Sequence, residues 1–206
     1  MEISEIKQLQ LKKFRERPFS WSNFSAFRDY DRELWYSRYI LNQKTPENSK
    51  MVFGKLVGKR IEKDLSYIPQ LPRHIMEYEM TATLKDAHGD FSLIGYADSY
   101  NPETKELDEF KTSSPTGWTQ KKVDSHDQLT YYALLLHLRD KVKPEHLTIR
   151  LHHMHTCEDG SFNIAFCKPF SLDTYTTKRT TRQVLMFASE ILRVRKEMEE
   201  YILAHS

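Results

Sequence analysis

Several features are scarce in this sequence, and each scarcity excludes a class of protein. Its 206 residues include two cysteines, Cys157 and Cys167, which are too few for a disulfide framework and fit a reducing compartment. No run of about 18 apolar residues is present to span a bilayer, and the polar N-terminus does not read as a signal peptide. We therefore expect a soluble, intracellular protein with no membrane partner, in the cytoplasm or, if the chain is viral, in the host cell.

The sequence also lacks a strong excess of either charge. The formal net charge of +2 is too small to indicate a nucleic-acid-binding protein by itself, so any basic surface must come from how the charges are distributed. No internal repeat or low-complexity linker divides the chain. The basic segment at residues 1–19 is more typical of a solvated, poorly ordered arm than of a binding element. We predict this N-terminal arm, followed by a single domain at residues 20–206 that is long enough to bury a core.

The periodicity of apolar residues predicts the secondary structure of that domain. Helical spacing predicts two short helices within residues 20–39 and further helices at about 53–67, 124–139 and 181–204. Alternation predicts strands at residues 75–84, 91–98 and 106–112, which would form an antiparallel meander, and another strand from residue 147. The order of these elements predicts an α/β domain.

Two acids and a lysine lie on neighbouring strands of this meander. Asp98 ends one apolar run, and Glu109 precedes Lys111 by two residues in the next. Because side chains alternate along a strand, Glu109 and Lys111 point to the same face, and a hairpin could bring Asp98 beside them. Such a group would suit a divalent metal and a phosphate. Taken singly, the residues have simpler explanations: Glu109 and Lys111 as an exposed salt bridge, and Asp98 as the start of a turn.

The helices before and after the meander carry further polar candidates. Glu62 lies one turn after Gly58 on one face of its helix, and Gln128 and Tyr132 lie one turn apart on theirs. Considered alone, Glu62 is a surface carboxylate. Gln128 fits equally well in a capping box, in which Ser125 caps the helix and Gln128 reaches back.

The later strand contains a second possible metal-binding group. His153, His155 and Cys157 alternate along it and could be read as a zinc cluster on one face. A structural zinc site normally needs a fourth ligand, however, and no CxxC motif or second His/Cys pair supplies one. Ordinary strand residues are therefore the favoured interpretation. A two-residue hairpin turn within residues 158–161 would leave Cys157 and Cys167 unpaired.

In this order and on these elements, the motifs resemble the RecB-like branch of the PD-(D/E)XK nuclease superfamily. They are Glu62, Gly95 to Asp98, Glu109-x-Lys111 and Gln128-x-x-x-Tyr132. The resemblance extends from about residue 20 to residue 132, and the remainder of the chain fits the architecture. It implies a PD-(D/E)XK nuclease core, in which helices flank a central mixed β-sheet made of an antiparallel meander plus a crossover helix and strand.

The resemblance implies a metal centre at the two acids. Asp98, Glu109 and the backbone carbonyl of Phe110 are expected to bind one or two Mg2+ or Mn2+ ions, which prefer oxygen ligands. Lys111 would orient the attacking water or stabilise the charge of the transition state. Glu62 would hold a metal-bound water from the neighbouring helix.

The implied activity is that of a Mg2+- or Mn2+-dependent deoxyribonuclease. Gln128 and Tyr132 would position the DNA backbone, because amide and phenol groups are good phosphate partners. Exonuclease action on DNA ends or single strands, in replication, recombination or repair, is favoured over endonuclease action. A catalytically inactive nucleic-acid-binding module that retains the nuclease fold is the alternative. A restriction-type endonuclease ranks lower because no recognition domain is evident.

The sequence departs from the family at two points. In many relatives a histidine that ligates metal occupies the position of Gly58, which has no side chain to offer, so the metal would rest on fewer protein ligands and more water. Some relatives hold an iron–sulfur cluster through four cysteines, one of them at the position of Tyr30. Because Cys157 and Cys167 cannot supply four thiolates, this chain resembles the cluster-free members, and no iron–sulfur cluster is expected.

Overall fold

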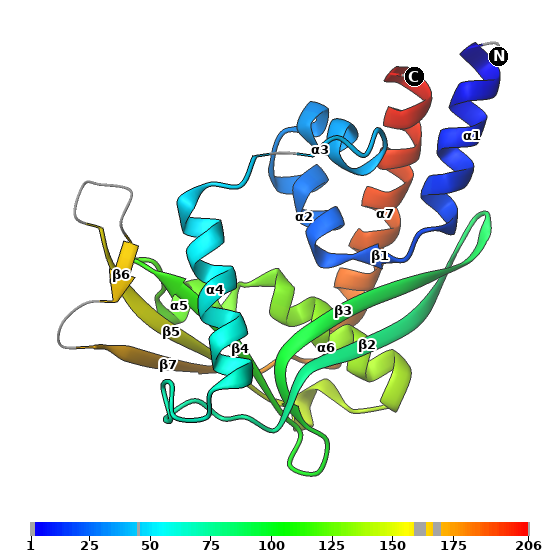
Figure 1. The fold of residues 1–206 in the computed structure, drawn as a ribbon. Helices are drawn as coiled ribbons and strands as arrows, with labels where there is room; N and C mark the ends of the chain where they lie inside the picture. The colour runs from blue at the N-terminus through cyan, green and yellow to red at the C-terminus, as the bar shows by residue number, and fades with distance from the viewer. Residues whose placement is uncertain (1–2, 45, 159–163, 167–169, 206) are drawn as a thin grey trace.

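The computed structural model describes residues 3–44, 46–158, 164–166 and 170–205 (Figure 1). The helices are α1 (Ile3–Glu16), α2 (Trp21–Asp29), α3 (Arg32–Tyr39), α4 (Ser49–Lys63), α5 (Gln120–Asp124), α6 (Asp127–Asp140), the 3-10 helix η1 (Pro144–His146) and α7 (Thr181–His205). The strands are β1 (Phe19–Ser20), β2 (Ile75–Asp86), β3 (Gly89–Asn101), β4 (Glu106–Ser113), β5 (Thr148–Glu158), β6 (Ile164–Phe166) and β7 (Leu172–Thr177). None of the described helices is apolar over a length that could cross a bilayer.

The strands form a mixed sheet, as expected. Its main path is β1-β3-β4-β5-β6, with β2 paired to β3 and β7 paired to β5. The pairs β2–β3 and β3–β4 are antiparallel and make up the predicted meander. The chain then crosses over through α5 and α6 and returns as β5, parallel to β4. This arrangement confirms the predicted fold class, a central mixed sheet flanked by helices.

Helices cover both faces of the sheet (Figure 1). On one face, α6 packs between β2, β3 and α7, so every residue from Leu129 to Leu136 is buried. On the other face, α4 lies against β4 and β6, and Val57 and Ile61 form a small separate core with Met154 of β5. Helices α1, α2 and α3 gather around α7 beside the end of the β2–β3 hairpin.

The N-terminal segment differs from its prediction. Residues 3–16 form α1 alongside α7, and Leu11 and Phe14 are buried in the main core. Arg15 of this helix donates a bidentate pair of hydrogen bonds to Glu199 of α7. The prediction of a poorly ordered arm is therefore wrong for these residues. Of the basic residues that suggested it, Lys12 and Lys13 lie exposed on the outer face of an amphipathic helix.

The cysteine prediction is also corrected. Cys157 is disulfide-bonded, so the expectation of an unpaired thiol is wrong at this residue. Across the β5–β6 pair, Cys157 lies opposite Ala165, whereas a two-residue turn would place Phe162 there. The predicted turn and Cys167 lie outside the described residues.

Candidate active site

The candidate site lies where β3 and β4 separate. These strands pair only between Ser99 and Asn101 on β3 and between Glu106 and Asp108 on β4. Asp98 and Glu109 are therefore the first residues beyond the pairing, at a fork in the sheet. There the backbone N–H of Phe110 donates to Asp98 Oδ2 at 2.5 Å, in place of a ladder hydrogen bond. The fork lets side chains from both strands converge in a gap that regular pairing would close.

Glu109 and Lys111 meet α6 at this fork. The Lys111 ammonium forms an ion pair with Glu109 Oε1 and donates to Gln128 Oε1 at 3.1 Å. Gln128 Nε2 in turn donates to Glu109 Oε1 at 2.9 Å. The second oxygen of Glu109, Oε2, is buried and has no hydrogen-bond partner among the described residues. Because an unsatisfied buried carboxylate oxygen is costly, this atom is suited to bind a cation.

Gln128 and Tyr132 are placed as their one-turn spacing predicts. Gln128 Nε2 also donates to Tyr132 Oη at 2.7 Å, which completes a chain of contacts from β4 to α6. The helix begins at Asp127, and its N-cap is His126. Ser125 instead ends the separate helix α5. The capping-box interpretation is therefore wrong, because the amide of Gln128 faces the site.

Gly95 allows α6 to lie this close to the sheet. A Cβ atom at position 95 would lie 2.7 Å from Leu135 Cδ1 and 3.1 Å from Tyr132 Cε1, both on α6. Neighbouring Tyr131 anchors the same contact, because its hydroxyl donates to the carbonyl of Ile94 at 3.0 Å. The glycine of the predicted motif is thus a packing residue. It sets the depth at which Gln128 and Tyr132 approach β4.

The acids of the fork repel each other electrostatically. Burial raises the pKa of Asp98 well above its ordinary value, and the charge of Glu109 raises it further. Burial opposes the charged form of Lys111, but the charges of Glu109 and Asp98 prevail and raise its pKa. One ammonium therefore faces two carboxyl groups. A divalent cation would remove this excess negative charge, and the donors are the carboxylate oxygens that Mg2+ and Mn2+ prefer.

Glu62 and Phe110 face the same site from the α4 side. They line a cavity of about 230 Å3 together with Asp98, Lys111 and Gly58. No described atom lies within 4 Å of the position that a Cβ on Gly58 would take. The structure thus brings all the predicted site residues to the fork, and their chemical roles stay predictions.

Glu77 is a site residue that the sequence pattern did not indicate. It lines the same cavity from β2. Its neighbours on this strand, Met76 and Tyr78, pair with Ser99 and Ala97 of β3. Its φ of 48° lies in the left-handed region, which is uncommon for a non-glycine residue and costs conformational energy. In the sequence Glu77 alternates with apolar neighbours, like any polar strand residue.

Partial burial raises the pKa of Glu77, and the charges of Glu62 and Glu109 raise it further. The carboxyl group of Glu77 is therefore within electrostatic reach of both acids. The cavity collects more negative charge than the motif alone predicts, which strengthens the case for a cation there.

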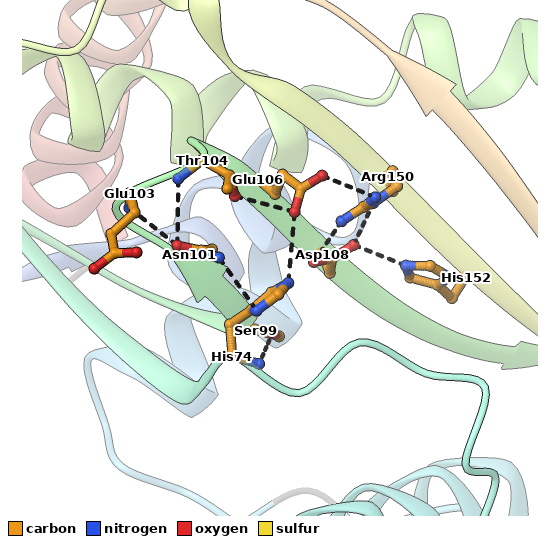
Figure 2. Close-up of polar contacts among 9 residues, drawn as sticks. All are labelled: His74, Ser99, Asn101, Glu103, Thr104, Glu106, Asp108, Arg150 and His152. Carbon is orange, nitrogen blue, oxygen red and sulfur yellow. Dashed lines mark hydrogen bonds and ion pairs between the residues drawn. The ribbon is translucent and has the colours of Figure 1, made fainter.

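Other acids on β4 are already neutralised (Figure 2). Asp108 is fully buried, and its Oδ1 accepts hydrogen bonds from Arg150 Nε and His152 Nε2, both at 2.8 Å. Glu106 is paired with Arg150 at 3.2 Å and with His74 at 3.6 Å. These two acids hold β4 to its neighbours. Among the acids of β4, Glu109 alone has a buried oxygen without a partner in the part of the chain that the structure describes.

A second cavity, of about 420 Å3, opens on the α2 and α6 side of the fork. Lys111 and Gln128 line it together with the aromatic residues Trp21, Tyr30 and Trp118. Lys111 lines the first cavity as well. The side chain of Lys111 therefore borders cavities on both sides of the gap.

No family model and no curated protein sequence matches this chain. It is similar in fold to SSO0001, with 15% identity, a TM-score of 0.53, and coverage of 100% of this chain and 88% of the other. It is also similar to a candidate exonuclease from Eubacterium rectale, with 14% identity, a TM-score of 0.55 and coverage of 96% and 88%. LHK-Exo in complex with dAMP aligns with 11% identity, a TM-score of 0.48 and coverage of 95% and 94%. The likeness to the first two shows that this chain shares their fold.

Proposed function

We propose that this chain is a metal-dependent DNA nuclease of the RecB-like branch of the PD-(D/E)XK superfamily. The observation that carries the proposal is the unpartnered Oε2 of buried Glu109, beside Asp98 and Lys111 at the fork of the sheet. Most buried carboxylate oxygens in folded proteins have a hydrogen-bond partner, and a bound ion is one explanation for an oxygen that has none. The substrate is DNA with free ends or in single strands, and exonuclease action is favoured.

The proposed metal is Mg2+ or Mn2+, held by Asp98, Glu109 and the backbone carbonyl of Phe110. The fit rests on the oxygen donors, the unpartnered Oε2 and the raised pKa of Asp98. When bound, the ion supplies polarisation of the scissile phosphate and a lowered pKa for a bound water. Glu62 and Glu77 line the same cavity and would accept hydrogen bonds from metal-bound water, on the side where Gly58 supplies no ligand.

The chain's own polar groups act on the phosphate. Lys111 presents an ammonium group, held by Glu109 and Gln128, to the charge that develops on the phosphate oxygens. Gln128 and Tyr132 position the DNA backbone. In the second cavity, Trp118 and Tyr30 offer aromatic faces on which the bases of a single strand can stack.

The test is digestion of labelled single- and double-stranded DNA with Mg2+, Mn2+ or a chelator. We expect cleavage with either metal, none with chelator, and none by folded Asp98→Ala or Lys111→Ala. Glu103→Gln, an exposed change on the β3–β4 hairpin away from the fork, is the matched control and should cut normally.

Two outcomes separate the alternatives. DNA that is shifted on a gel but never shortened would identify an inactive binding module and overturn the proposal. Comparison of circular with linear single strands tests the exonuclease preference, because an obligate exonuclease leaves the circle intact.

A further inference from the structure

We infer that His153, His155 and Asp173 form a second metal site, for a transition cation such as Zn2+, separate from the acids of the fork. The two histidines lie two residues apart on β5 and share one face of the strand. Asp173 of β7 is the register partner of His153. Each of the three residues offers one possible ligand atom, and these three atoms lie within 4.8 Å of one another. This inference does not depend on the proposed nuclease function.

His153 has the nitrogen that such a site requires. Its side chain is fully buried, and its Nε2 lies 2.8 Å from Ser113 Oγ and 3.3 Å from the Ser113 carbonyl oxygen. Because a carbonyl oxygen can only accept, these contacts place the hydrogen on Nε2 and the lone pair on Nδ1. Nδ1 is buried and has no hydrogen-bond partner among the described residues. Metal-binding histidines commonly donate their other N–H to a backbone carbonyl in this way.

His155 and Asp173 complete the group and leave a path to it. His155 Nε2 lies 2.6 Å from Asp173 Oδ2, and the rings of His153 and His155 are 4.5 Å apart. The Asp173 side chain is 45% exposed and that of His155 13%. A cation can therefore enter from the Asp173 side and replace the hydrogen bond between these two residues.

The donor set selects the class of metal. Two imidazole nitrogens and one carboxylate oxygen suit Zn2+ and neighbouring transition ions, whereas Mg2+ prefers oxygen ligands alone. Three protein ligands leave one position for water or an anion, so the fourth ligand of a closed structural site is not needed. Cys157, the next residue of this row on β5, is disulfide-bonded and cannot act as a thiolate ligand.

The location of the site determines which strands a bound cation would join. It would join β7 to β5, and β5 is the parallel neighbour of β4, with His153 in register with Lys111. Ser113, which contacts His153, is the last residue of β4. A bound cation would therefore brace the strand that carries the candidate active site.

The test is calorimetric titration of the chelator-stripped full chain with Zn2+ in excess Mg2+, which saturates oxygen-only sites. Absorption of bound Co2+ reports the ligand geometry independently. We expect one tight Zn2+ site, weakened on the order of 100-fold in His155→Asn and in Asp173→Asn. Exposed His146→Asn is the matched control and should bind as the parent does. His153 is left intact because its burial makes a change there a risk to folding.

Asp98→Asn distinguishes the two sites. Zn2+ binding that persists in Asp98→Asn and is lost in folded His155→Asn supports the second site. Unchanged binding in both His155→Asn and Asp173→Asn, or loss of binding in Asp98→Asn, would overturn it. Since DNA cleavage is not a readout, failure of this inference leaves the nuclease proposal standing, and the reverse also holds.

Discussion

Replacement of Lys111 by methionine separates a structural ion pair from a catalytic lysine. Glu109 is 4% exposed and Lys111 28%. Removal of one partner of a buried pair costs about 3–5 kcal/mol, because the other charge is left uncompensated. Gln128 continues to donate to Glu109 in the variant, and Lys111 is partly exposed. We therefore expect the free energy of unfolding to fall by about 3 kcal/mol, the lower end of this range. For a domain of this size that corresponds to a fall in Tm of about 6–12 °C.

A divalent cation should then restore stability without restoring activity. An ion bound at Glu109 replaces the missing positive charge, and binding at a hundred times Kd stabilises by about 2.7 kcal/mol. We expect Mn2+ to recover most of the lost Tm in thermal melts of Lys111→Met. Cleavage of labelled DNA under the same conditions should remain lower by about 100- to 1,000-fold, because the ammonium group no longer faces the phosphate.

Exposed Lys121→Met, on α5, is the control for loss of a lysine charge and should match the parent in both assays. A folded Lys111→Met variant that cuts DNA at the parental rate would refute the role given to Lys111. A variant whose Tm does not respond to Mn2+ would refute cation binding at Glu109.

Three further predictions concern other parts of the site. Gly58→His should bind Mn2+ at least about tenfold more tightly than Gly58→Ala in calorimetry, because the cavity has room for an imidazole ligand, and equal affinities would exclude position 58 from the metal's surroundings. Burial lowers the pKa of His126 to about 4, below its unfolded value near 6.5, so its contribution to stability is complete above pH 6.5 and is lost as the pH falls toward 4. Urea unfolding should show a loss of about 1.4 kcal/mol between pH 8 and pH 5.5 that is absent in His126→Asn, and identical pH profiles would contradict it. Gly95→Ala should lose about 1–3 kcal/mol and most of its cleavage, because the added methyl group meets Leu135 and Tyr132, and a variant with parental stability would mean that α6 can retreat at no cost.

Local periodicity was sufficient to predict the meander and its motif. The alternating runs around Asp98 and Glu109 specify strands, and antiparallel pairing of consecutive strands brings the two acids together. The one-turn spacing of Gln128 and Tyr132 placed both on the face of α6 that meets β4. These features depend on residues close together in the chain, and for that reason a single sequence reveals them.

The features that the sequence pattern missed depend on tertiary contacts. Asp173 meets His153 only because β7 returns antiparallel along β5, a pairing that no local signal specifies. The backbone of Glu77 is left-handed at a position between the residues that pair with Ser99 and Ala97, and its side chain looks ordinary in sequence. The basic residues of α1 suggested solvation, and only the contact with α7 reveals the buried face that contains Leu11 and Phe14.

The left-handed backbone conformation of Glu77 implies a trade-off between thermal stability and activity. A left-handed non-glycine residue costs of the order of 1–3 kcal/mol, and glycine at this position would remove that cost. A selection for thermal resistance alone would therefore be expected to favour glycine at position 77 and to lose the carboxylate from the cavity. Persistence of glutamate at this position in heat-resistant variants would mean that activity outweighs the conformational cost.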